Sequence, residues 1–216
     1  MKRLFLVCVL AAIGLLGACN VPMPSAANPV VVAAATPVPD PQNLETATFA
    51  GGCFWSMQRM LDEVPGVITT TVGFTGGTEP NPTYAQVSAE ITGHAEAVEV
   101  IFDRAQISYA ALVDAYWHDI DPVAVDRQFC DQGSSYRSAI FYHDAEQQRL
   151  ATASKEALTA SGRFAQPIAT EILAATAFYP AEEYHQKFYL KNPSHYALYR
   201  AGCGRDARLA EIWGTE

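Results

Sequence analysis

Cys53 lies in the stretch "ATFAGGCFWSMQRMLDEVPGV", residues 47–67, directly after two glycines and before two large aromatic residues. The residues before the glycines are typical of a short strand, and apolar residues recur at helical spacing after the cysteine. We therefore expect Cys53 at the N-terminus of a helix, where unpaired N–H groups and the helix dipole favour a thiolate and lower the pKa. This position suits a nucleophile. The alternative is a cysteine packed in the core.

Glu96 is a second group that could do chemistry, in the stretch "TGHAEAVEVIFD", residues 92–103. Alternation along a strand places Glu96 on one face with His94 and the apolar Val98, and Glu99 on the other face. A carboxyl group held on an apolar face has a raised pKa and stays protonated near neutrality. Glu96 is therefore a candidate proton donor. The alternative is a buried glutamate paired with an arginine.

A third, weaker indication comes from the loop "CDQGSS", which precedes the strand-like "SYRSAIFY". Asp131 and Tyr136 lie near the ends of this loop. Loops often carry functional groups, but Asp131 could equally stabilise a turn. Four further histidines show no metal-ligand spacing, and we interpret them as surface or core residues: His118, His143, His185 and His195.

The N-terminus has the pattern of an export signal. Two basic residues precede an apolar run, residues 4–17, that is short for a membrane span and suits a signal peptide. The following "LGAC" resembles a bacterial lipobox, which predicts that Cys19 is lipidated. Ordinary cleavage near Ala18 is the alternative. By the same resemblance, Asn20 after the cysteine favours the outer membrane.

The composition divides the chain into three parts. Six of its 13 prolines lie in residues 21–42, so this segment cannot bury a core and is expected to be an extended tether. We predict a lipoprotein-type signal peptide (1–18), a lipidated N-terminus with a Pro/Ala-rich tether (19–43), and one globular domain (44–216). The expected location is the periplasm, with the protein lipid-anchored to the outer membrane or, alternatively, soluble. The net charge of −9 and the lack of a basic patch do not suit a nucleic-acid partner.

Three cysteines remain in the globular domain, Cys53, Cys130 and Cys203. An odd number leaves one thiol unpaired in an oxidising compartment. No two of them have C-x-x-C spacing, which argues against a structural zinc site and against a thioredoxin-type motif. One structural disulfide plus one buried thiol is the plainest interpretation.

Together these segments resemble the class A peptide methionine sulfoxide reductases. "GGCFW" resembles the nucleophile motif of that family, "TGHAEAV" its acid motif and "DQGSSYRS" its third site strand. "PTYAQV", which contains Tyr84, and "YPAEEYHQKFYL" resemble two further segments, all in the family's order. Strands that alternate with helices in places, and follow each other in others, are typical of a two-layer α/β sandwich. The expected fold is thus α/β (α+β), a mixed sheet with helices packed on it and a ferredoxin-like core.

The resemblance implies reduction of methionine-S-sulfoxide, in proteins and as the free amino acid, to repair oxidative damage. It implies that Cys53 attacks the sulfoxide sulfur and that Glu96 donates the proton. Tyr84 and Tyr136 would hold the oxygen. The remaining expected site residues are Phe54 and Trp55, as a pocket for the methyl group, and Asp131, which would orient a water molecule or a polar substrate group.

The first half-reaction would leave Cys53 as a sulfenic acid, and a second thiol would convert it to a disulfide that an external dithiol such as thioredoxin reduces. No metal or organic cofactor is expected, and we expect a monomer. Cys203, between two glycines of a C-terminal tail, is the expected resolving cysteine, because such a tail could swing in. Cys130 is the alternative, as resolver, relay or bystander.

Two other functions stay open. In an oxidant sensor, oxidised Cys53 would signal to a partner, and no methyl pocket would be needed. In a cysteine acyl-transfer enzyme, His94 would serve as the base, which requires it to reach the thiol.

Overall fold

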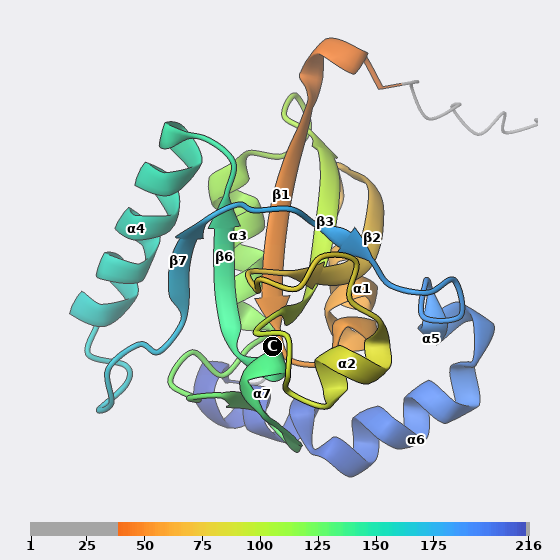
Figure 1. Cartoon of the computed structure of the whole chain (residues 1–216). Coiled ribbons are helices and arrows are strands. Elements are labelled where there is room, and N and C mark those ends of the chain that lie inside the picture. The colour runs from red at the N-terminus through yellow and green to blue at the C-terminus, as the bar shows by residue number, and fades with distance from the viewer. Residues whose placement is uncertain (1–38, 215–216) are drawn as a thin grey trace, which may run out of the picture. The chain divides into compact units, whose positions relative to one another are not determined.

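The structure is a computed structural model that describes residues 39–214. Its main sheet has the strand order β7-β6-β1-β3-β2-β8, and neighbouring strands are antiparallel apart from β6 and β7 (Figure 1). These strands are β1 (Leu44–Gly51), β2 (Val67–Thr75), β3 (Ala95–Asp103), β6 (Ser138–Tyr142), β7 (Glu171–Ala174) and β8 (Tyr179–Pro180). A separate pair joins β4 (Arg127–Gln128) to β5 (Asp131–Gln132). The mixed sheet agrees with the sequence prediction.

The helices lie where local signals place them, apart from the C-terminal region. They are α1 (Phe54–Asp62), α2 (Tyr84–Ser88), α3 (Tyr109–His118), α4 (Ala145–Ala160), α5 (Phe188–Lys191), α6 (Pro193–Cys203) and α7 (Arg205–Trp213). Ser108 and Asp144 cap α3 and α4, because each side chain accepts a hydrogen bond from a backbone N–H three residues later. The run β1-α1-β2-β3-α3-β6, with spatial order β6-β1-β3-β2, is the ferredoxin-like core.

Each face of the sheet has its own core. On one face, β1 and β3 pack residues such as Phe49 and Val98 against α1, α3 and α4. On the other face, small residues such as Ala50 and Ala97 pack with Phe141 under the chain that leads from β7 to β8. Figure 1 shows this connection crossing the sheet. The small side chains leave room for the crossing, so a helix layer covers one face and an extended segment the other.

The C-terminal region differs from the sequence prediction. The stretch "AEEYHQKFYL" forms turns and then the short α5. The residues predicted to form a swinging tail instead form α6 and α7, separated by Gly204 at φ +70°. Trp213 packs against the main core, and its indole N–H donates to the Ile120 carbonyl at 3.2 Å. Packing of α7 thus anchors the segment.

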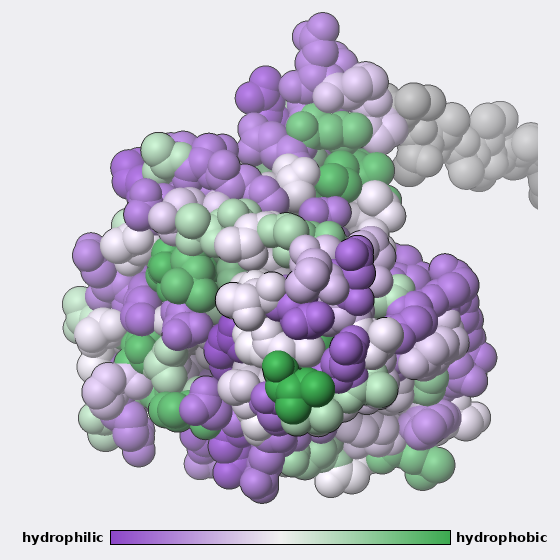
Figure 2. Space-filling model, viewed as in Figure 1, coloured by the Kyte–Doolittle hydropathy of each residue, from purple (hydrophilic) through white to green (hydrophobic). Residues whose placement is uncertain are grey.

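The N-terminal predictions fall largely outside the described residues. The signal peptide, Cys19 and most of the tether lie in residues 1–38. Within residues 39–214, no helix combines the length and apolar character needed to cross a membrane. On the face that Figure 2 shows, apolar residues form small separate groups in a mainly hydrophilic surface. That face therefore has no broad apolar surface of the kind that marks a large interface.

Candidate active site

Cys53 lies between the end of β1 and the start of α1, as predicted. It is the N-cap residue of α1, and its carbonyl accepts hydrogen bonds from the Ser56 and Met57 N–H groups at 3.0 and 3.3 Å. Gly52 before it has φ +82°, and a Cβ there would lie 2.5 Å from the Gln128 side chain. Only glycine tolerates both the positive φ and the close approach of the Gln128 side chain. This turn holds the thiol at the helix N-terminus, where it is 6 % exposed.

The protonation state of Cys53 differs from the sequence prediction. Burial raises the pKa of the thiol far above its usual value, and the Glu96 charge raises it further. Hydrogen bonds from Tyr199 and the Trp55 backbone lower the pKa but do not offset desolvation. The expected lowering by the helix dipole is therefore wrong for the resting site. Cys53 rests as a thiol and must lose its proton during the reaction.

Glu96 lies beside Cys53 on β3 and is 3 % exposed. Its Oε2 accepts a hydrogen bond from the Phe54 N–H at 3.0 Å. Burial raises its pKa to about 8, with smaller contributions from the Asp131 and Glu90 charges. The alternative of an arginine partner finds no support among the described ion pairs, none of which includes Glu96. Glu96 is thus a neutral acid at pH 7.

We expect a pH profile that follows the Glu96 pKa. Below about pH 8 the carboxyl holds its proton and can donate it, and above this pH the proton is lost. The first-turnover rate should be level near neutrality and then fall about tenfold per pH unit. Stopped-flow single turnovers measured from roughly pH 6 to pH 10, which brackets the raised pKa of Glu96, check this rate profile. A rate that rises steadily through pH 8 would show that thiol ionisation, rather than the acid, controls the step.

Aromatic side chains form one wall of the site. Trp55 stacks parallel on Phe188, with 3.7 Å between ring centroids, and its indole N–H donates to His185 Nδ1 at 3.0 Å. Phe54 is buried and packs against His185 and Tyr84, with centroids 5.1 and 6.4 Å apart. Three aromatic partners therefore fix the orientation of Trp55 and Phe54. His185, interpreted from sequence as a surface or core residue, is a buried part of this wall.

Tyr84 and Tyr136 lie on the Glu96 side. Tyr84 begins α2, which the Thr83 capping box holds in place, and Tyr136 ends the short 3₁₀ turn Ser134–Tyr136. Burial and the Glu96 charge raise the pKa of both hydroxyls. Both tyrosines are half-buried and remain O–H donors at neutral pH.

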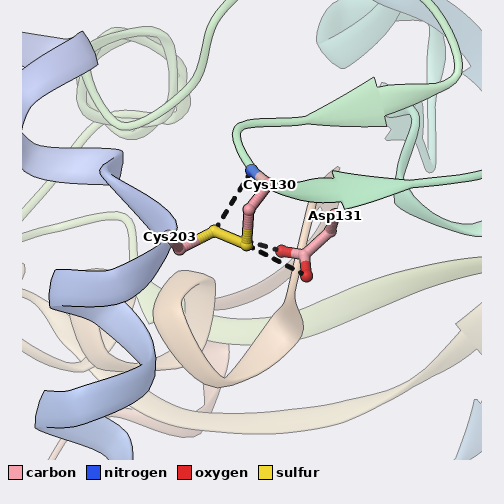
Figure 3. Close-up of side chains that lie close together, drawn as sticks. All are labelled: Cys130, Asp131 and Cys203. Carbon is pink, nitrogen blue, oxygen red and sulfur yellow. Dashed lines mark hydrogen bonds between the residues drawn. A yellow bond between two sulfur atoms is a disulfide. The ribbon is translucent and has the colours of Figure 1, made fainter.

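A disulfide joins Cys130 to Cys203 next to the third predicted group, Asp131 (Figure 3). The Cα atoms are 4.9 Å apart, and the Asp131 oxygens lie 3.7 and 3.8 Å from the two sulfurs. Tyr199 links this group to the nucleophile: its hydroxyl donates to Asp131, lies 3.8 Å from the Cys203 sulfur and contacts the Cys53 thiol. The disulfide thus lies one side chain away from Cys53.

Sequence reasoning missed Tyr199. A signal exists, because Tyr199 precedes Cys203 by four residues and shares its helix face once α6 is recognised. The predicted site residues do come together: Cys53, Phe54, Trp55, Tyr84, Glu96, Asp131, Tyr136, Cys130 and Cys203. Cys53 is the one free cysteine in the described part of the chain, which leaves the nucleophile position reduced.

His94 does not reach the site as a base. Its Nδ1 accepts a hydrogen bond from the Gly77 N–H at 3.1 Å, and its Nε2 donates to the Glu79 carbonyl at 2.8 Å. The ring is 2 % exposed, and both nitrogens bind backbone groups of the same loop. His94 therefore orders this loop. It is not available as the base of a cysteine acyl-transfer enzyme.

The comparisons agree with this geometry. The family model for peptide methionine sulfoxide reductase matches residues 45–216. The peptide methionine sulfoxide reductase MsrA of Bacillus subtilis (strain 168) is 52% identical over 172 residues, covering 80% of this chain and 97% of that protein.

Two solved structures share the fold. One is methionine sulfoxide reductase A of Corynebacterium diphtheriae, with TM-score 0.63 and 36% identity over 70% of this chain and 76% of that one. The other is reduced Mxr1 from Saccharomyces cerevisiae, with TM-score 0.65 and 31% identity over 73% and 90% of the two chains. With a buried thiol, a neutral acid and a neighbouring disulfide at one site, the chain belongs to the class A peptide methionine sulfoxide reductases and is a thiol-dependent peptide-methionine (S)-S-oxide reductase.

Proposed function

We propose that Cys53 is the nucleophile of this reductase and Glu96 its general acid. One observation carries the proposal: a free, buried thiol lies beside a buried carboxyl that is protonated at neutral pH. A sulfoxide sulfur is a poor electrophile until its oxygen gains a proton. A soft sulfur nucleophile and a neutral acid are the two groups that this reaction needs.

The first half-reaction balances with these groups. The Cys53 sulfur attacks the substrate sulfur while Glu96 gives its proton to the oxygen, with O–H donation from Tyr84 and Tyr136. The oxygen ends on Cys53 as a sulfenic acid, and methionine leaves. The proton that Cys53 loses restores Glu96 through solvent, so no net proton is consumed.

Substrate binding uses the aromatic wall. We propose that Trp55 and Phe54 enclose the methyl group, since Trp55 is a fixed, half-buried ring next to the thiol and the buried Phe54 ring packs against the same His185. Asp131 would orient a water molecule or a polar group of the substrate, because its half-buried carboxyl faces the same site. Burial raises the Asp131 pKa, whereas the Tyr199 hydrogen bond and the Arg205 charge lower it.

For the second half-reaction, we propose that Cys203 attacks the sulfenic acid and that Cys130 then takes over the disulfide. The observed pairing of Cys130 with Cys203 supports a relay, because it leaves Cys53 free for another cycle. Cys130 is exposed whereas Cys203 is half-buried, so an external dithiol meets the Cys130 sulfur first. The alternatives are direct resolution by Cys130 and a static structural disulfide.

Disulfide mapping should separate these alternatives. In reduced enzyme treated with sulfoxide and no reductant, Cys203→Ser should form one methionine per enzyme, accumulate trappable sulfenic acid on Cys53 and fail to cycle with a thioredoxin-type donor. Cys130→Ser should accumulate the link between residues 53 and 203. Mass spectrometry reads both outcomes. A dominant link between residues 53 and 130 in the unaltered protein would contradict Cys203 as the resolver.

We further propose that the protein acts in the periplasm as a monomer, anchored through lipid on Cys19 in the outer membrane, and repairs oxidised envelope proteins. Export into an oxidising compartment fits a disulfide-based cycle driven by a thioredoxin-like donor, with no other cofactor. The "LGAC" pattern and the proline-rich stretch after it support the anchor. The alternative is a soluble periplasmic protein.

Cell fractionation tests the anchor. Cys19→Ala should move the protein from membranes to the soluble periplasmic fraction, because a single diacylated cysteine is its only predicted attachment. Sulfoxide reduction by the purified protein should stay unchanged. Recovery of the unaltered protein in the soluble fraction, with an unmodified cysteine, would overturn the lipoprotein assignment.

A further inference from the structure

Arg205 is a buried arginine that the reaction steps above do not use. It begins α7, two residues after Cys203, and is 2 % exposed. Its Nη2 lies 2.7 Å from the Asp119 carboxylate and donates to the Asp119 carbonyl at 2.6 Å. A buried charge is tolerated only when well paired, so this ion pair strongly constrains where α7 begins.

The guanidinium of Arg205 contacts a neighbour of each of the other two cysteines. Both terminal nitrogens lie 3.4 Å from the carbonyl oxygen of Gly51, two residues before Cys53. The guanidinium carbon lies 4.6 Å from the ring centroid of Phe129, which directly precedes Cys130. Phe129 has φ +53°, an uncommon conformation for a side-chain-bearing residue that needs support from its surroundings. One side chain thus connects the three segments that carry the cysteines.

Tyr199 connects the sulfur of Cys203 to the nucleophile in this anchored position. The Tyr199 hydroxyl lies 3.8 Å from the Cys203 sulfur and contacts the Cys53 thiol, so one hydroxyl group separates the two cysteines. A large swing of the C-terminal segment is unnecessary, and α7 packing opposes it. Rotation of the Cys203 side chain on a fixed helix end can bring its sulfur first to Cys53 and then to Cys130.

We propose that Arg205 is a positioning residue for thiol exchange, which clamps the end of α6 against the nucleophile turn and the Cys130 loop. This inference rests on the relay proposed above. In the first step the Cys203 thiolate forms a bond to the Cys53 sulfur, the S–O bond breaks, and the oxygen leaves as water with two protons. In the second step the Cys130 thiolate attacks the Cys203 sulfur and displaces Cys53, which regains a proton. The sulfenic acid is the two-electron oxidant, so these steps need no other redox partner.

The test compares Arg205→Met and Arg205→Lys with the control Arg208→Met. Arg208 lies on the same helix and pairs with Asp121 and Glu211. The reduced full-length proteins are mixed with excess methionine sulfoxide without reductant. Methionine formed, free thiols lost and sulfenic acid trapped by a cyclic 1,3-diketone are followed over time.

For Arg205→Met we expect a burst of one methionine per enzyme at nearly the unaltered rate, with loss of the Cys53 thiol. Loss of the Cys203 and Cys130 thiols should then be slower by about 10²-fold, the cost of a small misplacement, and the sulfenic acid on Cys53 should be long-lived. Arg205→Lys keeps a charge for Asp119 but cannot also reach the Gly51 carbonyl. Its rate of disulfide formation should lie between those of Arg205→Met and the unaltered protein. Arg208→Met should match the unaltered protein. If Arg205→Met fails to fold, the same measurements on Arg205→Lys and Asp119→Asn test the proposal instead.

Unchanged thiol loss in the folded Arg205 variants would overturn the inference, as would loss of the methionine burst in a natively folded variant. The proposed relay fails separately if the unaltered protein forms no disulfide through Cys203. These readouts distinguish a clamp from a residue that merely stabilises the fold, because stability alone does not split the first turnover from the resolution step.

Discussion

Cys53→Ser is expected to abolish reduction of methionine-S-sulfoxide. A serine hydroxyl is a weak nucleophile toward sulfur at neutral pH, and both ring nitrogens of His94 are bound to backbone groups and cannot ionise it. The substitution changes one atom in a buried position, so the fold should persist. Methionine released in a single turnover by the reduced protein, together with the melting temperature, checks both expectations.

The matched control is Cys130→Ser, which removes a cysteine of the proposed relay and keeps the nucleophile. It should retain at least one stoichiometric turnover. If Cys53→Ser kept the first turnover of the unaltered protein, the assignment of the nucleophile would be wrong.

Glu96→Gln is expected to slow the reductase step by roughly 10²–10⁴-fold, the usual contribution of a positioned acid. Glutamine keeps the shape of the side chain and can still accept the hydrogen bond from the Phe54 N–H, but it cannot supply the proton. The decline in rate above about pH 8 should also disappear. Rapid-quench measurement of methionine formed in one turnover gives both readouts.

Glu99→Gln provides the control on the same strand. Glu99 lies three residues away on the opposite face of β3 and is half-buried, without the contact to the nucleophile turn. It should change the rate little. Equal effects of the two substitutions would contradict the strand-face argument that selects Glu96.

The sequence predicted the parts of the site that depend on local periodicity. The strand before Cys53 and the helix after it follow from apolar spacing and the double glycine, and alternation selected Glu96. The nucleophile turn, the strand that carries Glu96 and the mixed sheet therefore agree with the structure. The resemblance added Tyr84 and gave a role to Tyr136, which the loop pattern had indicated only weakly. The two tyrosines come from distant segments and meet only in the fold.

Local patterns could not predict the effects of tertiary packing. The pKa of Cys53 was expected to fall at a helix N-terminus, but the segments packed over it desolvate the thiol and raise the pKa. The pairing of Cys130 with Cys203 spans 73 residues of sequence, and glycines beside Cys203 suggested a tail where the structure has two helices. Tyr199 and Arg205 gain their positions from those helices. Their importance is visible only once the C-terminal region is folded.

The central claim is that this domain reduces the S epimer of methionine sulfoxide with its own thiols. The most direct measurement gives the purified, reduced protein racemic methionine sulfoxide, first without and then with dithiothreitol, and follows each epimer by chiral chromatography. We predict two methionines per enzyme without reductant, because the relay frees Cys53 to attack a second sulfoxide. With dithiothreitol present, we predict consumption of the S epimer alone. No methionine under either condition, or equal consumption of both epimers, would contradict it.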